Sequence, residues 1–266
     1  MNPLRPAVVF PSLIAFARLA GAAEPAGAVW PPRPANTPDL PPPEITETWT
    51  PVPPVVTAPA GGLPSDAIVL FDGKSLDNWE PVRPNGPRWK IEDGAMVIVP
   101  NKEPCDQRTK QAFGDMQLHI EWRAPAEARG HSQERGNSGI FFMGLYELQV
   151  LDSYNNPTYV NGMVGSVYKQ HIPLANPSRP PGEWQVYDAV FVAPRFAADG
   201  TLQRPARLTA FLNGVLVLLD VEIKGPTVYR GFPKYEAHPP ALPLVLQDHR
   251  NPVAYRNIWA RGLSLP

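Results

Sequence analysis

The chain has 266 residues, with 24 Lys and Arg against 25 Asp and Glu, so its formal net charge at pH 7 is −1. This balance excludes the strongly basic footprint that nucleic acids and anionic membrane surfaces attract. The one cysteine, Cys105, cannot close an intramolecular disulfide. A reactive thiol is not indicated either, because no candidate base lies beside Cys105 in the sequence.

The N-terminus has the pattern of an export signal followed by a tether. Residues 1–23 combine Arg5, an apolar run over residues 7–17 and small residues near the end, which is typical of a secretory signal. The run is too short to span a bilayer, and no later stretch is apolar enough to do so. Residues 24–64 are rich in proline and poor in aliphatic side chains, so we expect a flexible linker. The protein is therefore predicted to be exported, periplasmic or extracellular.

Residues 65–266 have the pattern of an all-β domain. Short runs rich in β-branched and aromatic residues alternate with clusters of Gly, Pro, Asn and Asp, and no amphipathic helix of three turns is evident. The expected strands are Ala67–Phe71, Arg88–Glu92, Ala95–Pro100, Met116–Arg123, Gly139–Met143, Leu145–Leu151, Gln185–Val192, Ala206–Leu212, Val215–Ile223, Leu242–Gln247 and Tyr255–Leu263. Strands of this number and length predict a jelly-roll sandwich of two antiparallel sheets.

The expected strand Met116–Arg123 alternates most clearly. Every second residue from Met116 to Trp122 is apolar, while His119 and Glu121 fall on the opposite face. This pattern predicts a half-buried antiparallel strand with His119 and Glu121 on a solvated face.

The stretch GLYELQVLDSY, residues 144–154, gathers polar side chains within an apolar strand. A period of two directs Glu147 and Gln149 away from the core, and Asp152 joins them if a bulge adds one residue. The spacing is similar to the E-x-D-x-x-E strand of laminarinase-like retaining glycosidases, in which the outer carboxylates act as nucleophile and acid/base. Here Gln149 replaces the middle acid, so that machinery is not reproduced. A hydrated strand edge is the alternative.

Two further stretches carry candidate binding groups. In RGNSG, the glycines permit a close approach of the backbone to a ligand, and Asn137 either donates to a sugar or closes the turn. In GSVYKQH, the Tyr168 ring suits the apolar face of a pyranose and Lys169 suits a developing oxyanion, although both also suit an ordinary surface.

The end of the expected strand Leu242–Gln247 carries the best candidate for a general base. Gln247 and Asp248 are followed by His249, and imidazole is the side chain that ordinarily titrates near neutrality. A turn histidine without a catalytic role is the alternative.

The following stretches run in chain order from about residue 67 to residue 263: LFDGKSLDNWE, TKQAFGDMQLHIEW, RGNSGIFFMGLYELQVLDSY, PGEWQVYDAVFVAPRF, PARLTAFLNGVLV and LVLQDHRNPVAYRNIWAR. Together they resemble the 3-keto-disaccharide hydrolase domain family. The resemblance implies a concanavalin A-like jelly roll and substrates that are glycosides already oxidised to a ketone at sugar C3. It also implies a mechanism in which the C2 proton is abstracted, the C1 aglycone leaves by β-elimination, and water adds to the resulting double bond.

The resemblance also implies roles for particular residues. His249 is expected to abstract or return the proton, and Glu147 to act as the second acid/base or as a metal ligand. With Gln149 and Asp152, Glu147 would offer oxygen ligands suited to a hard divalent cation such as Ca²⁺. The side chains expected to bind the sugar are those of Arg135, Asn137, Gln149, Tyr168, Lys169 and Gln247. No organic cofactor is implied.

Two departures from the family pattern keep other functions open. The family usually carries Gly where this chain has Lys169 and Arg250, and these cations would narrow the pocket, alter the substrate range or signal lost activity. A non-catalytic carbohydrate-binding module is therefore one alternative. A retaining glucanase-like glycosidase is the other, and Gln149 disfavours it. The sugar, the linkage and the oligomeric state are not indicated by the sequence.

Overall fold

The computed structural model describes residues 41–265, so the predicted export signal and the first part of the predicted linker lie outside the described residues. The chain divides into two compact units, Met1–Pro54 and Val55–Pro266. In the described part of the first unit, the regular structure is one short 3-10 helix, η1 (Pro43–Thr46). Within residues 41–265, no helix is long and apolar enough to cross a membrane.

The second unit is a jelly-roll-like sandwich of two large antiparallel sheets, as the sequence predicts. Its strands are β1 (Ile68–Phe71), β2 (Trp79–Pro81), β3 (Lys90–Glu92), β4 (Ala95–Val97), β5 (Gln107–Phe113), β6 (Met116–Arg123), β7 (Ser138–Phe142), β8 (Tyr146–Val150), β9 (Gln185–Val192), β10 (Arg195–Phe196), β11 (Leu202–Arg204), β12 (Arg207–Leu212), β13 (Val215–Glu222), β14 (Leu242–Leu246) and β15 (Ala254–Gly262). Two short 3-10 helices, η2 (Ser132–Glu134) and η3 (Val160–Gly162), lie in its loops.

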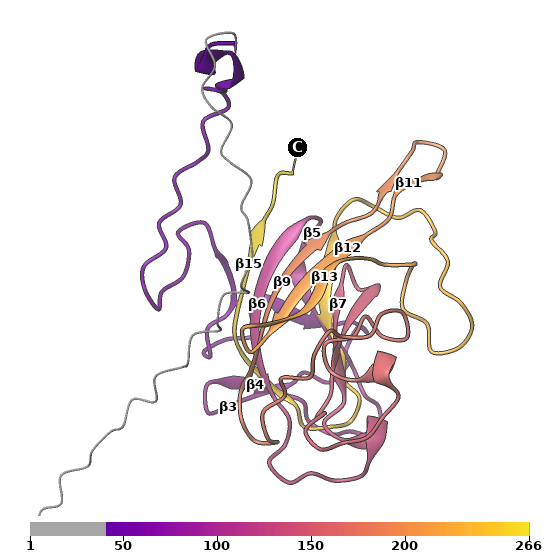
Figure 1. The fold of residues 1–266 in the computed structure, drawn as a ribbon. Helices are drawn as coiled ribbons and strands as arrows, with labels where there is room; N and C mark the ends of the chain where they lie inside the picture. Colours follow the sequence, from indigo (N-terminus) through magenta and orange to yellow (C-terminus); the bar gives the residue numbers. More distant parts are fainter. Residues whose placement is uncertain (1–40, 266) are drawn as a thin grey trace, which may run out of the picture. The chain divides into compact units, whose positions relative to one another are not determined.

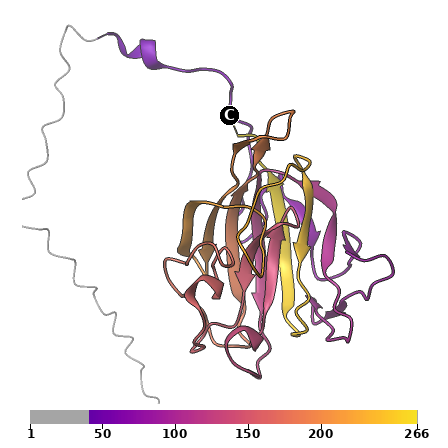
Figure 2. The same ribbon diagram turned by 90° about the vertical axis from the view of Figure 1, so that its right-hand side faces the viewer.

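The larger sheet has eight strands in the order β13-β12-β9-β6-β15-β4-β3, with β1 paired to β15. The smaller sheet has five, in the order β2-β5-β14-β7-β8, and β10 pairs with β11 as a separate ribbon. Figure 1 labels β6, β9, β12 and β13 side by side, and Figure 2 shows the strands running nearly upright.

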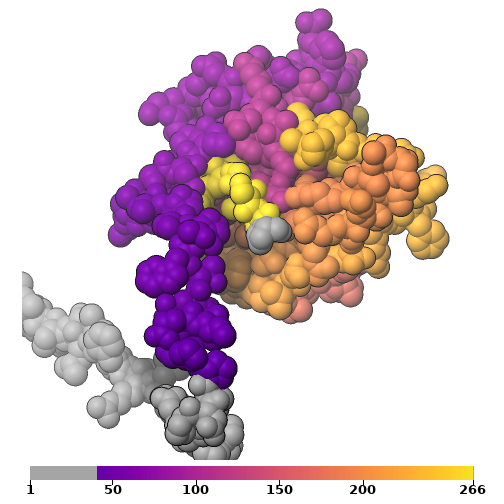
Figure 3. Space-filling model, turned by 90° about the horizontal axis from the view of Figure 1, so that it is seen from above, coloured from indigo at the N-terminus to yellow at the C-terminus, as the bar shows by residue number. Residues whose placement is uncertain are grey.

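The ends of the second unit are joined in the larger sheet. Strand β1 pairs antiparallel with β15, and Arg261 donates two hydrogen bonds of 2.7 Å to the two carboxylate oxygens of Asp66. Seen from above, the yellow C-terminal residues lie beside purple residues from the start of the unit (Figure 3). The first and last strands of the unit are therefore paired with each other, and this pairing does not involve the residues that precede Val55.

Every strand expected from the sequence is present. Strands β6 and β9 have the predicted bounds. Strands β2, β5, β10 and β11 were not predicted, and β5 is the important omission because it joins β2 to β14 in the smaller sheet. Its sequence, QRTKQAF, lacks an alternating apolar pattern, so it is a strand because two neighbours pair with it rather than because of its own periodicity.

The alternation of β6 is confirmed, because all four apolar residues from Met116 to Trp122 are buried in the core between the sheets. On the opposite face, the side chains of His119 and Glu121 are each only 16 % exposed. His119 Nδ1 lies 2.6 Å from Asp188 Oδ1, and Arg256 Nε donates to Glu121 at 2.6 Å. The face is therefore a hydrogen-bonded network rather than a freely solvated surface.

Candidate functional site

A cavity of about 280 Å³ opens beside the polar face of the smaller sheet. Its walls come from β7, β8, the turn after β14 and two loops: Asn137, Phe141, Glu147, Gln149, Tyr168, Thr227, Tyr229, Gln247 and His249. The structure thus brings together six of the residues expected from the sequence, including the proposed acid/base pair. We call this hollow the Glu147 cavity.

The pairing of β7 with β8 makes room for the carboxyl group. Glu147 lies opposite Phe141, and Gln149 lies opposite Gly139. A Cβ atom on Gly139 would fall 2.6 Å from Glu147 Oε1 and 2.7 Å from the Phe141 ring, closer than unbonded carbon atoms approach. The Glu147 carboxyl group therefore occupies space that is free because Gly139 has no side chain.

Glu147 is buried with little polar compensation. Glu147 is only 4 % exposed to solvent. Among residues 41–265, no group forms a hydrogen bond with its carboxyl group. Burial, followed by the negative charge of Asp106, raises the pKa of Glu147 to about 8. The carboxyl group is therefore protonated at neutral pH and can donate a proton.

Asp106, immediately before β5, is a charged neighbour of Glu147 that the sequence did not reveal. Burial raises the pKa of Asp106, and the charge of Asp248 adds to the rise. A hydrogen bond from the Asp248 backbone N–H, at 2.8 Å, acts in the opposite direction. Asp106 does not line the Glu147 cavity, but its charge contributes to the raised pKa of Glu147 there.

The turn after β14 positions His249 without fixing its ring. The Asp248 carboxylate accepts backbone N–H groups of Cys105 at 3.0 Å and of Arg250 at 2.9 Å, so it stabilises the turn. Although Asp248 is adjacent to His249 in the sequence, its carboxylate forms no hydrogen bond with the imidazole and does not orient it. Within the described chain the exposed His249 ring has no hydrogen-bond partner, so both ring nitrogens are available to a substrate.

Two amides form the polar end of the cavity. Asn137 Nδ2 donates to the Gln133 carbonyl at 2.7 Å, and Gln149 Nε2 donates to Asn137 Oδ1 at 3.3 Å. These bonds hold both amides in place. Gln149 Oε1 is buried, and no group within residues 41–265 donates to it. Buried acceptors are rarely left without a donor, so this oxygen is suited to receive a ligand hydroxyl.

Arg135 and Asp152 do not line the Glu147 cavity. Arg135 donates to Asp152 Oδ2 from Nε at 3.0 Å and from Nη2 at 2.5 Å, and both side chains are largely buried. Every residue of β8 is buried, and its pairing with β7 has no register shift, so burial gives no sign of the expected bulge within the strand. Arg135 binds the Asp152 carboxylate, and Asp152 lines a different cavity, of about 640 Å³.

The expected metal ligands therefore do not converge. Glu147 and Gln149 line one cavity, whereas the Asp152 carboxylate is neutralised by Arg135 beside another. Within residues 41–265, no group of three or more His, Cys, Asp and Glu side chains is arranged to hold a metal ion. The expected Ca²⁺ set does not fit this geometry, and we derive no step through a metal.

The two cations at expected glycine positions have a common backbone feature. Lys169 has φ 58° and Arg250 has φ 63°, in the left-handed region that favours glycine. Neither side chain lines the Glu147 cavity, so neither narrows it. Arg250 lines the cavity that contains Asp152, and Lys169 lines a neighbouring hollow that shares Tyr168 and Tyr229 with the Glu147 cavity.

Three lining residues were not identified from the sequence. Phe141 could have been found from its register opposite Glu147, had the pairing of β7 with β8 been assigned. Thr227 accepts the Glu147 backbone N–H at 3.1 Å, and Tyr229 is 69 % exposed. Both lie in the loop after β13, which has no periodic pattern to reveal them.

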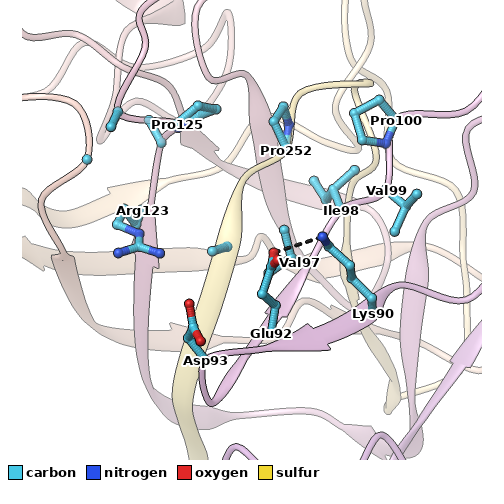
Figure 4. Close-up of a pocket in the computed structure, with 14 residues that line it drawn as sticks. Lys90, Glu92, Asp93, Val97, Ile98, Val99, Pro100, Arg123, Pro125 and Pro252 are labelled. Atoms are coloured by element: carbon cyan, nitrogen blue, oxygen red, sulfur yellow. Dashed lines mark ion pairs between the residues drawn. The ribbon is translucent and has the colours of Figure 1, made fainter.

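A separate hollow of about 360 Å³ lies at the edge of the larger sheet. Figure 4 shows Lys90 and Glu92 of β3 facing each other there, and their ion pair measures 2.8 Å. No histidine is among the described residues that line this hollow, and its other walls include Val97, Ile98 and Pro252. It therefore lacks the combination of acid and base that the Glu147 cavity has.

The comparisons with known proteins point to one family. A sequence model of the 3-keto-alpha-glucoside-1,2-lyase-like domain matches residues 66–261. A solved structure from Parabacteroides distasonis, assigned as a glycosyl hydrolase, has 50 % identity and a TM-score of 0.76, covering 83 % of this chain and 96 % of that one. A second structure from the same organism, with the same assignment, has 21 % identity and a TM-score of 0.54, covering 74 % and 94 %, and supports the fold alone. No curated protein matches the chain significantly.

Proposed function

Because the chain belongs to the 3-keto-alpha-glucoside-1,2-lyase-like domain family, we propose that it hydrolyses glycosides oxidised to a ketone at sugar C3. The family and the similar glycosyl hydrolase support a carbohydrate-active enzyme. The observation that carries the more specific proposal is the Glu147 cavity, where a protonated buried carboxyl group and an unpaired imidazole line one space. Elimination next to a ketone needs one proton acceptor and one proton donor, and this pair supplies them.

In the first half of the reaction, His249 takes the proton from C2. The ketone at C3 acidifies this hydrogen, and the electrons of the C–H bond form an enolate on C2, C3 and the C3 oxygen. When the ketone re-forms, those electrons make a C1–C2 double bond and the bond from C1 to the aglycone oxygen breaks. Glu147 gives its proton to the departing oxygen, which leaves His249 protonated and Glu147 ionised.

In the second half, water adds across the double bond. The Glu147 carboxylate takes a proton from water as the oxygen attacks C1, and the protonated His249 returns a proton to C2. Both residues regain their starting protonation states, and the net reaction is hydrolysis. Gln149, Asn137 and Gln247 provide the amides that would bind sugar hydroxyl groups during both halves.

A retaining glycosidase mechanism is not supported by the cavity. That mechanism needs two carboxyl groups about 5–5.5 Å apart, with one of them ionised as the nucleophile. Among the described residues that line the cavity, Glu147 is the one carboxylic acid, and burial keeps it protonated near neutral pH.

The proposal is tested by incubating the full chain with 3-keto-trehalose, 3-keto-lactose and a 3-keto aryl glucoside, beside the unoxidised parents. We expect cleavage of the keto forms alone. In D₂O, Glu147→Gln should still exchange the C2 hydrogen while losing aglycone release, and His249→Ala should lose both. His131→Ala, which changes an exposed histidine outside the cavity, is the control. Cleavage of the parents by the wild-type protein contradicts the proposal.

A non-catalytic carbohydrate-binding module is the second candidate. The unpaired Gln149 Oε1 favours a bound hydroxyl group whether or not chemistry follows. Binding of the keto sugar with neither C2 exchange nor aglycone release would establish this second candidate and exclude the first.

A further inference from the structure

The hollow beside the Glu147 cavity has a different chemical character from the cavity itself. It measures about 560 Å³ and shares Tyr168 and Tyr229 with the Glu147 cavity, so the two adjoin along these side chains. We call it the tyrosine cavity. Its remaining walls include Tyr159, Phe232, Lys169 and Lys224.

Three aromatic rings lie around a cation in the wall of this cavity, the Lys169 ammonium group. Lys169 Nζ lies 4.3 Å from the Tyr229 ring centroid, 5.6 Å from that of Tyr168 and 5.7 Å from that of Tyr159. It also donates to the Tyr229 carbonyl at 2.7 Å. Three aromatic faces and one carbonyl therefore hold the ammonium group at a defined position.

The position of Lys169 is unusual for its residue type. Its backbone φ of 58° lies in the left-handed region, which is unfavourable for a residue that has a Cβ atom. A strained residue whose side chain projects into a cavity is a reason to look for a function. Lys224 adds a second positive charge, and no Asp or Glu is among the described residues that line the tyrosine cavity.

The walls offer aromatic rings and cations, and several of their polar side chains already have hydrogen-bond partners. Gln170 uses its Nε2 on the Gly225 carbonyl at 2.9 Å and its Oε1 on the Lys224 backbone N–H at 2.7 Å. The hydroxyl groups of Tyr159 and Tyr168 bond to each other at 2.7 Å. Phe232, which has no polar group, is 96 % exposed. The Asn161 amide has no hydrogen-bond partner among the described residues and would suit a sugar hydroxyl group. A planar anion would use both the stacking surfaces and the cations, which make up more of the walls.

We propose that the tyrosine cavity is the leaving-group subsite and that it selects an aromatic aglycone carrying a carboxylate. This inference rests on the proposed function, because the aglycone must depart next to the sugar held in the Glu147 cavity. The ring would lie against Tyr229 and Phe232, and the carboxylate would meet Lys169 and Lys224. The substrate class is then a 3-keto glycoside of a hydroxybenzoate type.

Binding is measured without turnover, by titrating the full chain with 4-hydroxybenzoate and with its neutral analogue 4-hydroxybenzamide. We expect the carboxylate to bind about 5- to 10-fold more tightly, as one or two charge-assisted contacts predict. Lys169→Met should remove most of that preference. Lys234→Met removes the same charge from an exposed lysine that does not line the cavity, and it should keep the preference. Equal binding of the two analogues, or loss of the preference in Lys234→Met alone, overturns the inference.

Turnover distinguishes failure of this inference from failure of the proposed function. The 3-keto glucosides of the same two phenols should show the same preference in kcat/KM, again removed by Lys169→Met. If 3-keto-trehalose is cleaved and 4-hydroxybenzoate does not bind better than its amide, only the aglycone assignment is wrong. If the preference in binding is found and no keto glycoside is cleaved, the proposed reaction is wrong, and the tyrosine cavity binds aromatic carboxylates without being a leaving-group subsite.

Discussion

Replacing Glu147 with Gln should stabilise the protein, and the gain should grow with pH. The pKa of Glu147 rises from its ordinary value of 4.5 to about 8 in the folded chain. Between these two pH values the folded protein holds a proton that the unfolded chain has released, so the free energy of unfolding falls as the pH rises. Because each pH unit is worth about 1.4 kcal/mol, the full loss is about 5 kcal/mol, reached above pH 8.

Glutamine resembles the protonated acid in shape and does not titrate. Below pH 4.5 the wild-type protein and Glu147→Gln should therefore differ in free energy of unfolding by less than about 1 kcal/mol, since an amide replaces a neutral acid of similar shape. At pH 7.5 the variant should be more stable by about 4 kcal/mol. Other titrating groups largely cancel in this difference.

The assay is urea denaturation of both proteins at intervals from pH 4.5 to 8.5. Glu236→Gln, which changes an exposed glutamate outside the Glu147 cavity, is the matched control. A difference between Glu147→Gln and wild type that stays flat across this range would refute the reasoning, because the folded protein would then hold no extra proton on Glu147.

Three further perturbations test the geometry around the cavity. Gly139→Ala should lower kcat/KM on a keto substrate by about 100-fold or more, because the new methyl group displaces the Glu147 carboxyl group; unchanged kcat/KM contradicts the close approach. Asp106→Asn removes the second cause of the raised pKa of Glu147, so the alkaline limb of the pH–rate profile should move to lower pH; an unmoved limb means that the charge of Asp106 does not reach Glu147. Arg135→Ala leaves the buried Asp152 carboxylate without its partner and should lower the free energy of unfolding, measured by urea denaturation, by about 3–5 kcal/mol. The KM for a keto substrate should remain nearly unchanged. A large rise in KM with wild-type stability would instead support Arg135 as a sugar ligand.

The fold could be predicted where strands carry their own periodicity. Strand β6 alternates because one of its faces packs into the core, and its bounds were predicted correctly. Strand β5 carries mostly polar residues and owes its conformation to pairing with β2 and β14. Pairing between distant segments leaves no local signature in a polar sequence. The omission of β5 also concealed Asp106, which lies immediately before it and acts electrostatically on Glu147.

The site could be predicted where the residue type carries the chemistry. Glu147 and His249 were identified as an acid and a base, and they line one cavity although they are far apart in sequence. Tyr229 could not be identified in the same way, because an exposed aromatic residue in an irregular loop resembles any surface residue until the loop is placed. The left-handed backbone of Lys169 was equally invisible, since the sequence shows the side chain and not the φ angle.

The two carboxylic acids of the β8 stretch show why spacing alone is a poor guide to carboxylate chemistry. Glu147 and Asp152 lie in the sequence much as the two acids of a retaining glycosidase do, yet the fold gives them opposite surroundings. Asp152 forms an ion pair with the Arg135 guanidinium. Glu147 meets no cation or hydrogen-bond donor among residues 41–265, so burial turns it into a proton carrier. The partner that each acid finds, rather than the number of residues between them, is therefore the reason why we propose proton transfer instead of nucleophilic attack at this cavity.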